Sequence, residues 1–245
     1  MRMDPRPIVL GLAATLSAAC SEPGMRDRMT DAIGTLSRVQ ASPQPVDGWF
    51  VENARGIAIV DETQAGLVIS GAGGRGLLLR RNGNSWSAPC VIKVEGFGVG
   101  LTLGGEGRSL VITFQSDAAL DRFIADGSYF LAQAQGTFGD AYGRTSDPVQ
   151  DKDQVHVWAV AGGLYATAAL GSIGFHMDHE ANQAAYGKDV TEWDILDGKV
   201  QQPVGQSALV ARLDRIVRTS EDARLEQPRN EAAAASQAPA AVHEE

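Results

Sequence analysis

Cysteine is almost absent from this chain, which has two in 245 residues. Two thiols form neither a disulfide framework nor a cysteine-rich zinc site. Positive charge is also scarce, because 21 Lys and Arg stand against 30 Asp and Glu, and the formal net charge is −9. A nucleic-acid-binding protein would usually carry a strongly basic face. The composition therefore argues against a disulfide scaffold and against a nucleic-acid partner.

One apolar run stands at the start of the chain, and it is short. Arg2 and Arg6 precede the run Ile8–Ala19, whereas a permanent transmembrane helix needs about 20 residues. Basic residues followed by a short apolar run that ends in small residues indicate a secretory signal. The run ends Leu16-Ser17-Ala18-Ala19-Cys20, which resembles the lipobox of bacterial lipoproteins, although Ser17 stands where leucine is usual. An ordinary signal peptide or a buried cysteine is the alternative.

The lipobox resemblance implies cleavage before Cys20 and acylation of Cys20, which would leave a mature chain with a net charge of −10. Several acyl chains would anchor the protein stably. Ser21, rather than Asp, follows the cysteine, and by resemblance to lipoprotein sorting signals this favours the periplasmic face of the outer membrane. Cys90, in an apolar strand-like run, is expected to be a small core residue.

The remaining sequence divides into segments of different composition and periodicity. We expect a lipoprotein signal peptide over 1–19, a helix and a proline-containing linker over 20–45, and the main domain over 46–200. A C-terminal amphipathic helix should follow over 201–225, and the Ala/Pro/Glu-rich residues 226–245 should form a disordered tail.

From Gly56 to about Gly174 the pattern is that of β-strands. Short apolar runs such as Gly56–Val60 and Ala65–Ser70 are separated by polar residues, and Asn82-Gly83 is a strong hairpin signal. The spacing predicts eight or nine strands. The expected fold class is α+β, with a mainly antiparallel sheet that is curled or closed like a barrel or sandwich, short helices, and amphipathic helices at both ends.

Several segments carry a family resemblance. Residues 53–60 resemble the "AKGIAIF" opening of the SYLF domain, Trp86–Pro89 its "WSAP" segment, and Gly96–Gly104 its glycine-spaced strand. Asp117–Phe123 resembles its "ALDKF" helix, and Asn182 with Tyr186-Gly187-Lys188 resembles its closing "N…YYGK" segment. These blocks occur in the family's order over residues 50–198, so the chain is identified as a member of the SYLF-domain family.

The resemblance implies non-catalytic lipid binding. Eukaryotic members of the family bind membrane phosphoinositides, some fungal members bind actin filaments, and the family has no accepted catalytic residues. Two residues depart from the pattern: Asp61 stands where proline is usual, and Thr102 stands where glutamine is common. A secreted bacterial protein would normally meet neither actin nor phosphoinositides. We therefore expect the domain to bind a membrane surface through a phosphoinositide-type or other anionic lipid, with the actual lipid open, and the chain to be held at the membrane by its lipid anchor, without an actin partner.

A basic cluster around one predicted hairpin is the candidate headgroup site. Its members are Arg55, Arg75, Arg80, Arg81 and Lys93. A local basic patch on an acidic protein suits an anionic headgroup. The alternative is that these charges protect an exposed strand edge from pairing.

Two motifs suggest other chemistry. Gly71–Gly76 matches G-x-G-x-x-G, but it opens a predicted strand rather than the helix that a dinucleotide site requires. His176-Met177-Asp178-His179-Glu180 gathers possible metal ligands, with Asp178 as a helix N-cap in the plainer interpretation. We expect no cofactor and no metal. The alternatives are a structural envelope protein whose anchor is its lipid contact, and a metal-dependent enzyme at His176 and His179.

Overall fold

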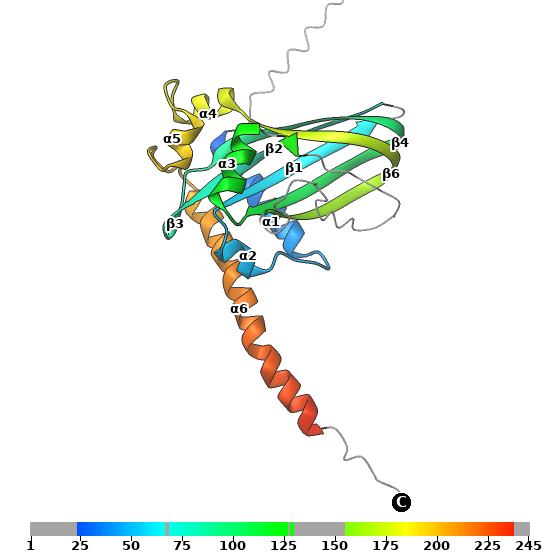
Figure 1. Ribbon diagram of the computed structural model, residues 1–245, viewed down its shortest axis with the longest axis vertical. Coiled ribbons are helices and arrows are strands. Elements are labelled where there is room, and N and C mark those ends of the chain that lie inside the picture. The colour runs from blue at the N-terminus through cyan, green and yellow to red at the C-terminus, as the bar shows by residue number, and fades with distance from the viewer. Residues whose placement is uncertain (1–23, 67–68, 127, 130–154, 238–245) are drawn as a thin grey trace, which may run out of the picture.

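The computed structural model describes residues 24–66, 69–126, 128–129 and 155–237 (Figure 1). The helices in these ranges are α1 (Met25–Gln40), α2 (Gly48–Glu52), α3 (Asp117–Asp126), α4 (His179–Tyr186), α5 (Glu192–Leu196) and α6 (Gln206–Gln237). The strands are β1 (Gly56–Gly66), β2 (Ile69–Asn82), β3 (Ser85–Trp86), β4 (Cys90–Phe114), β5 (Ser128–Tyr129) and β6 (Val155–Met177). Residues 1–19, predicted as a signal peptide, and Cys20 lie outside the described residues.

The strands form one antiparallel sheet in which β4 and β6 are bent. Residues 90–99 of β4 pair antiparallel with β2, and residues 104–114 pair antiparallel with β1. Since β1 and β2 are themselves antiparallel, β4 must reverse its direction between these two stretches. β6 follows β4 through the reversal, from Ile92–Met177 to Phe114–Val155. Both strands therefore arch around the end of the β1–β2 hairpin (Figure 1).

The arches confirm the predicted α+β class with a mainly antiparallel, curled sheet. The order of the described strands is β3-β2-β1-β4-β6-β5, with β2 also paired to β4, and they do not close into a barrel. Within the described residues, several runs that were predicted as separate strands, divided by glycine or polar residues, belong to the same strand. The polar residues Asp61–Gln64, which separate two apolar runs of the sequence, lie within β1.

Glycine within β2 permits a close approach to β1. A Cβ atom on Gly74 would lie 2.3 Å from the carbonyl oxygen of Asp61, and one on Gly76 would lie 2.5 Å from that of Ile59. The segment Gly71–Gly76, which was expected to open a strand, is itself part of β2. The Asn82-Gly83 turn was predicted correctly: it joins β2 to β3, with Gly83 at φ 62°.

Helices cover both faces of the sheet. On one face Ile57, Ile59 and Leu77 pack in a core with Leu36 of α1 and Leu213 of α6. On the other, alternate residues of the same strands pack with α3 and α5, as strand alternation requires. We call these the α1 face and the α3 face. Among the described helices, none is both long and apolar enough to span a membrane.

The helix at the C-terminal end is longer than the sequence predicts. Helix α6 continues to Gln237, whereas the sequence places a disordered tail from residue 226. The alanines of this stretch are the best helix formers, so a helix already begun extends through them. The outer half of α6 projects away from the sheet (Figure 1).

Candidate functional site

The five predicted headgroup residues do not gather on one surface. Arg81 contacts Trp86 in the core of the α1 face, whereas its neighbour Arg80 pairs with carboxylates of α3. Arg55 lies 4.0 Å from the α3 residue Asp117. Arg75 lines a pocket beneath α1, and Lys93 is its Cα partner on β4. Alternation along the strands separates residues that are close in the sequence.

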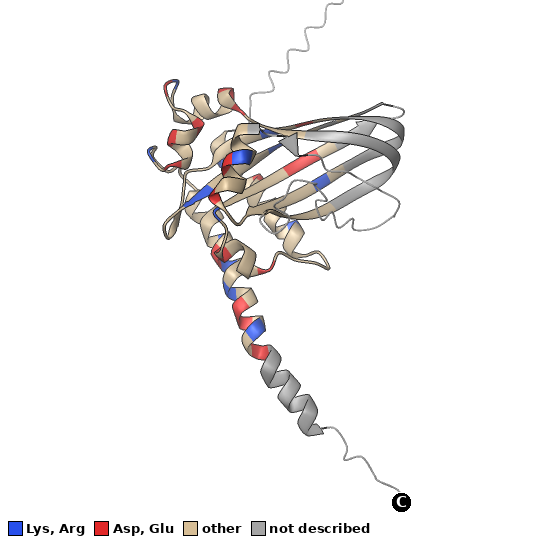
Figure 2. Cartoon of the chain, in the orientation of Figure 1, with Lys and Arg blue, Asp and Glu red and all other residues tan. Residues whose placement is uncertain are grey.

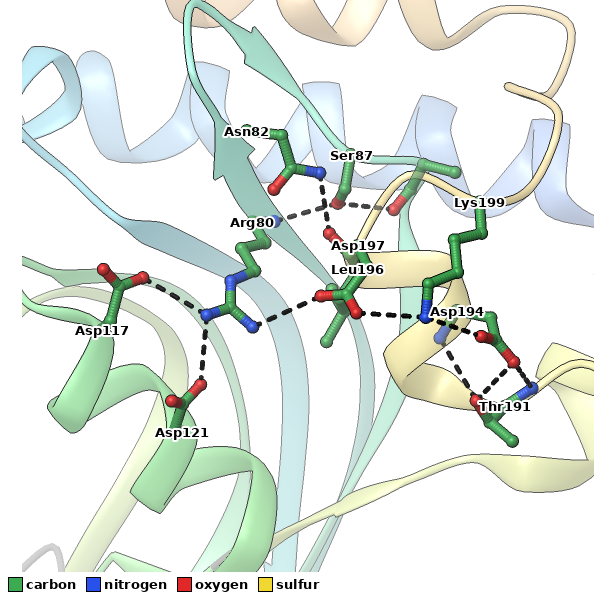
Figure 3. Close-up of polar contacts among 11 residues, drawn as sticks. Arg80, Asn82, Ser87, Asp117, Asp121, Thr191, Asp194, Leu196, Asp197 and Lys199 are labelled. Atoms are coloured by element: carbon green, nitrogen blue, oxygen red, sulfur yellow. Dashed lines mark hydrogen bonds and ion pairs between the residues drawn. The ribbon is translucent and has the colours of Figure 1, made fainter.

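Arg80 is enclosed by three carboxylates (Figure 3). Its guanidinium nitrogens lie 3.3 Å from Asp117, 3.4 Å from Asp121 and 3.7 Å from Asp197, and the side chain is only 17% exposed. These partners belong to α3 and to the end of α5. Arg80 thus connects β2 to two helices. Because three carboxylates already neutralise its charge, Arg80 is poorly suited to attract an anionic membrane.

A second set of polar contacts, around Asp194, lies next to the Arg80 cluster (Figure 3). Asp194 accepts hydrogen bonds from the Thr191 hydroxyl and from Lys199, which lowers the pKa of Asp194 to about 2. Thr191 and Asp194 form a capping box at the start of α5. Asn82 donates to the Leu196 carbonyl at 2.9 Å. These contacts hold α5 in place next to the β2–β3 hairpin.

Arg81 is also a structural residue. Its guanidinium donates to the carbonyl oxygens of Ala54 at 3.0 Å and Val51 at 2.8 Å, and lies 4.1 Å from the Trp86 ring centroid. Burial lowers the pKa of Arg81. Its contacts hold the segment between α2 and β1 in place.

Arg75 and Lys93 are the two candidates that lie together on the more accessible part of the α1 face. They are partners in the β2–β4 register. Arg75 is exposed, and the Lys93 side chain is 44% exposed and lies 3.5 Å from Glu95. Of the predicted cluster, this pair is best placed to meet an external anion.

A pocket of about 140 Å³ separates α1 from β1 and β2 next to Arg75. We call it the α1 pocket. Its lining comprises Arg28, Asp31, Ala32, Thr35, Ile59, Asp61, Arg75, Gly76 and Leu77. The α1 side of this pocket was not predicted from the sequence, although a polar stripe along α1 signals it. The stripe recurs every three or four residues and comprises Arg28, Asp31, Thr35 and Arg38.

One wall of the α1 pocket is the carboxylate of Asp61, which already accepts several hydrogen bonds. Asp61 accepts hydrogen bonds from Arg38 at 2.7 and 2.8 Å, from the Thr35 hydroxyl at 2.7 Å and from the Ser109 hydroxyl at 2.9 Å. Arg38 Nε also donates to Ser109 at 2.7 Å. This network ties α1 to β1 and β4 and neutralises Asp61.

The two histidines of the predicted metal cluster have different surroundings in the structure. His176 is on β6 opposite Lys93, whereas His179 Nδ1 lies 2.5 Å from Glu192 of α5. Asp178 accepts a hydrogen bond from the Ala181 amide and caps α4, as predicted. The described residues contain no group of three His, Cys, Asp or Glu side chains arranged to hold a metal ion.

Cys90 is fully buried, as predicted for a core residue. Burial raises the pKa of the Cys90 thiol, so the native state disfavours the reactive thiolate. Its neighbour Asn182 donates to the Cys90 sulfur at 3.3 Å.

Charge of both signs is mixed over the described surface. Blue and red segments alternate along α6 and lie next to each other on α3 (Figure 2). The mixture seen in this view favours a local anion-binding site over a broad basic face.

The curled antiparallel sheet, covered by helices on both faces and containing the quoted segments, defines a SYLF-type domain. A sequence model of the Ysc84 family, described as "Las17-binding protein actin regulator", matches residues 95–216. The chain belongs to this family.

Curated relatives agree with this assignment. SH3 domain-containing YSC84-like protein 1 of Xenopus laevis is 28% identical over 185 residues, which cover 74% of this chain and 55% of the relative. The rat protein of the same name is 30% identical over 160 residues, covering 62% and 46%. Protein YSC84 of Saccharomyces cerevisiae is 27% identical over 184 residues, covering 73% and 39%. This chain spans about half the length of such relatives, and none of these names refers to a catalytic activity. No solved structure matches the chain.

Proposed function

We propose that this protein is a non-catalytic membrane-surface module that binds anionic lipid headgroups through Arg75 and Lys93. The observation that carries the proposal is the pairing of these two exposed cations on adjacent strands, beside the α1 pocket. Each Lys or Arg near an anionic membrane contributes about 1 kcal/mol of binding free energy. A pair of cations can therefore attract a membrane locally although the whole chain is acidic.

The membrane context of the proposal comes from the N-terminal sequence. Acylation of Cys20 would hold the domain at the bacterial cell envelope, on the periplasmic face of the outer membrane. The anchor would supply stable attachment, and the Arg75–Lys93 pair would orient the domain on the lipid surface. Actin is not part of the proposal, because a secreted bacterial protein would not meet it.

Vesicle co-sedimentation tests the proposal with the chain from Ser21 onward, which lacks the anchor but holds every described residue. Vesicles of phosphatidylglycerol and phosphatidylcholine should sediment the wild-type protein at low salt. The double variant Arg75→Glu, Lys93→Glu should bind at least about tenfold more weakly, because two attractive charges become repulsive. Added salt should weaken wild-type binding.

The control is Arg122→Glu, Lys188→Glu, which makes the same charge change at two exposed positions elsewhere. It should bind like the wild type. Equal losses in both double variants would mean that only net charge matters, and failure of the wild type to sediment would leave the acyl anchor as the lipid contact. Arg80 and Arg81 are unsuitable for this test because their substitution would disturb the fold.

A further inference from the structure

We propose that the loop between α5 and α6 inserts Val204 into the membrane interface beside the acyl anchor of Cys20. The loop comprises residues 197–205, and we call it the Val204 loop. The inference rests on the proposed function, because it takes the anchor from that proposal and adds which side of the domain meets the lipid. This hydrophobic contact is distinct from the attraction that Arg75 and Lys93 exert by charge.

The chain between the acyl anchor and the domain is short. Helix α1 begins at Met25, so only residues 21–24 separate it from Cys20. An extended chain spans at most about 3.6 Å per residue, which puts the start of α1 within about 18 Å of the anchored cysteine. A compact domain of about 200 residues is about 40 Å across. The anchor would therefore bring surfaces near the start of α1 against the lipid.

The Val204 loop lies next to this end of α1. A Cβ atom on Gly205 would lie 3.3 Å from Met29 Cε, and Met29 is about one helical turn from Met25. A membrane that holds Cys20 is thus within reach of the loop. By contrast, Leu225 lies about 30 Å further along α6, in the part of the helix that projects away from the sheet (Figure 1).

The Val204 loop is fixed on both sides of its exposed valine. Val204 is 76% exposed, more than any other large hydrophobic side chain among the described residues. On one side, Gln202 donates to the Trp86 carbonyl at 3.4 Å, and on the other, the buried Gln206 donates to the Ser87 carbonyl at 2.8 Å. These bonds hold the loop while Val204 points into solvent, so insertion requires no rearrangement of the fold.

The surface around Val204 lacks the charge that an anionic membrane would repel. Residues 198–213 contain no Asp or Glu, although the whole chain has 30. Exposed members of this stretch are uncharged and include Gln201, Ser207, Ala208 and Ala211. At the start of α1, the exposed Arg26 offsets the exposed Asp27. A single exposed valine is ordinary, but one on an acid-free surface beside the anchor would gain from burial in the membrane interface.

Fluorescence tests the inference with the full, acylated chain in vesicles of phosphatidylglycerol and phosphatidylcholine. A cysteine is introduced by Val204→Cys, or by Leu225→Cys as the control at a 70% exposed position, and is labelled with the environment-sensitive dye NBD. Cys20 is acylated and Cys90 is fully buried, so neither takes the dye.

The reference is the same labelled variant of the chain from Ser21 onward in solution. In vesicles, the dye at position 204 should emit at shorter wavelength than in the reference and should be quenched by a nitroxide-labelled lipid. The dye at position 225 should behave as it does in solution.

Substitution of Val204 tests whether the contact strengthens binding. In the chain from Ser21 onward, Val204→Asp should bind the same vesicles at least about fivefold more weakly, and Val204→Phe should bind them more tightly. The matched controls Leu225→Asp and Leu225→Phe should bind like the wild type. Opposite effects at one exposed position cannot come from damage to the fold, and a Val204→Asp variant that binds like the wild type would contradict the inference.

The fluorescence experiment has three outcomes that would overturn the inference. These are a purified chain without acyl groups, a dye at position 204 that stays in water, and dyes at positions 204 and 225 that respond alike. The first would leave Arg75 and Lys93 as the lipid contact.

The Arg75→Glu, Lys93→Glu variant separates this inference from the proposed function. If this charge reversal abolishes vesicle binding of the chain from Ser21 onward but position 204 never meets lipid, the inference fails and the proposed function stands. If position 204 of the anchored chain meets lipid while the charge reversal leaves vesicle binding unchanged, the proposed function fails and the inference stands.

Discussion

At the scale of single residues, Asn182 replaces a missing piece of β-sheet. The β4–β6 ladder begins at Ile92 and Met177, so Val91 lies just beyond it. The Asn182 side chain accepts a hydrogen bond from the Val91 amide at 2.7 Å and donates to the Val91 carbonyl at 3.1 Å. Asn182 is fully buried, and its amide therefore acts as the backbone of an additional strand residue. This gives a physical reason for the asparagine in the "N…YYGK" segment.

Asn182→Ala should lower the free energy of unfolding by about 2 kcal/mol, because the buried Val91 N–H loses its acceptor, whereas the Val91 carbonyl keeps the hydrogen bond from the Asp178 amide. Urea denaturation followed by circular dichroism measures the change. The matched control is Gln183→Ala, an exposed neighbour on the same helix, which should stay within about 0.5 kcal/mol of the wild type. Similar losses in both variants would show that the Asn182–Val91 hydrogen bonds contribute no more than an exposed position of the same helix.

At the scale of helices and strands, the sequence predicted features that depend on neighbouring residues, such as caps and turns. It did not predict features that depend on distant parts of the chain, such as the bends of the long strands. Asp178, predicted as a helix N-cap, accepts a hydrogen bond from the Ala181 amide, and Asn82-Gly83 forms the predicted turn. Ser116 and Thr191 also accept hydrogen bonds from helix amides. The bends of β4 and β6 could not be predicted, because pairing with β1 and β2 determines them. The same limit applies to the candidate site. The sequence identified the five cations, but it could not show which of them lie together on one face of the sheet.

Arg80 illustrates how one side chain joins three elements, and its substitution tests that role. Arg80→Gln should lower the free energy of unfolding by about 2 kcal/mol, because the carboxylates of Asp117, Asp121 and Asp197 lose their shared cation. The estimate is below that for a fully buried pair because the three carboxylates are partly exposed. Thermal and urea unfolding should agree.

Arg122→Gln is the control for Arg80, since it removes the same charge from the exposed side of α3. It should change stability little. A destabilised Arg122→Gln with an unchanged Arg80→Gln would assign the effect to the net charge of α3 rather than to the link between elements.

At the scale of the whole molecule, one sheet is shared by two hydrophobic cores. Successive residues of β1 alternate between them: Ile57 and Ile59 belong to the core with α1 and α6, and Ala58 and Val60 to the core with α3. Loss of either helical layer would expose one side of the same strands. The two cores are therefore coupled through the backbone hydrogen bonds of the sheet.

Substitution in either core should shift the same unfolding transition. Leu36→Ala removes a buried side chain of α1, and Phe123→Ala removes one of α3. The expected losses are about 3 and 4 kcal/mol, typical of cavities left by Leu and Phe. Replacing Trp49, Trp158 and Trp193 with Phe leaves Trp86, in the α1-face core, as the single tryptophan. If the sheet couples the cores, far-UV circular dichroism and the fluorescence of Trp86 should report one coincident transition in each variant on this background. Phe123→Ala tests this most sharply, because its cavity lies on the face opposite Trp86. A tryptophan signal that keeps its wild-type midpoint while the α3 face melts earlier would mean that the two faces unfold independently, and that the sheet carries two separable units.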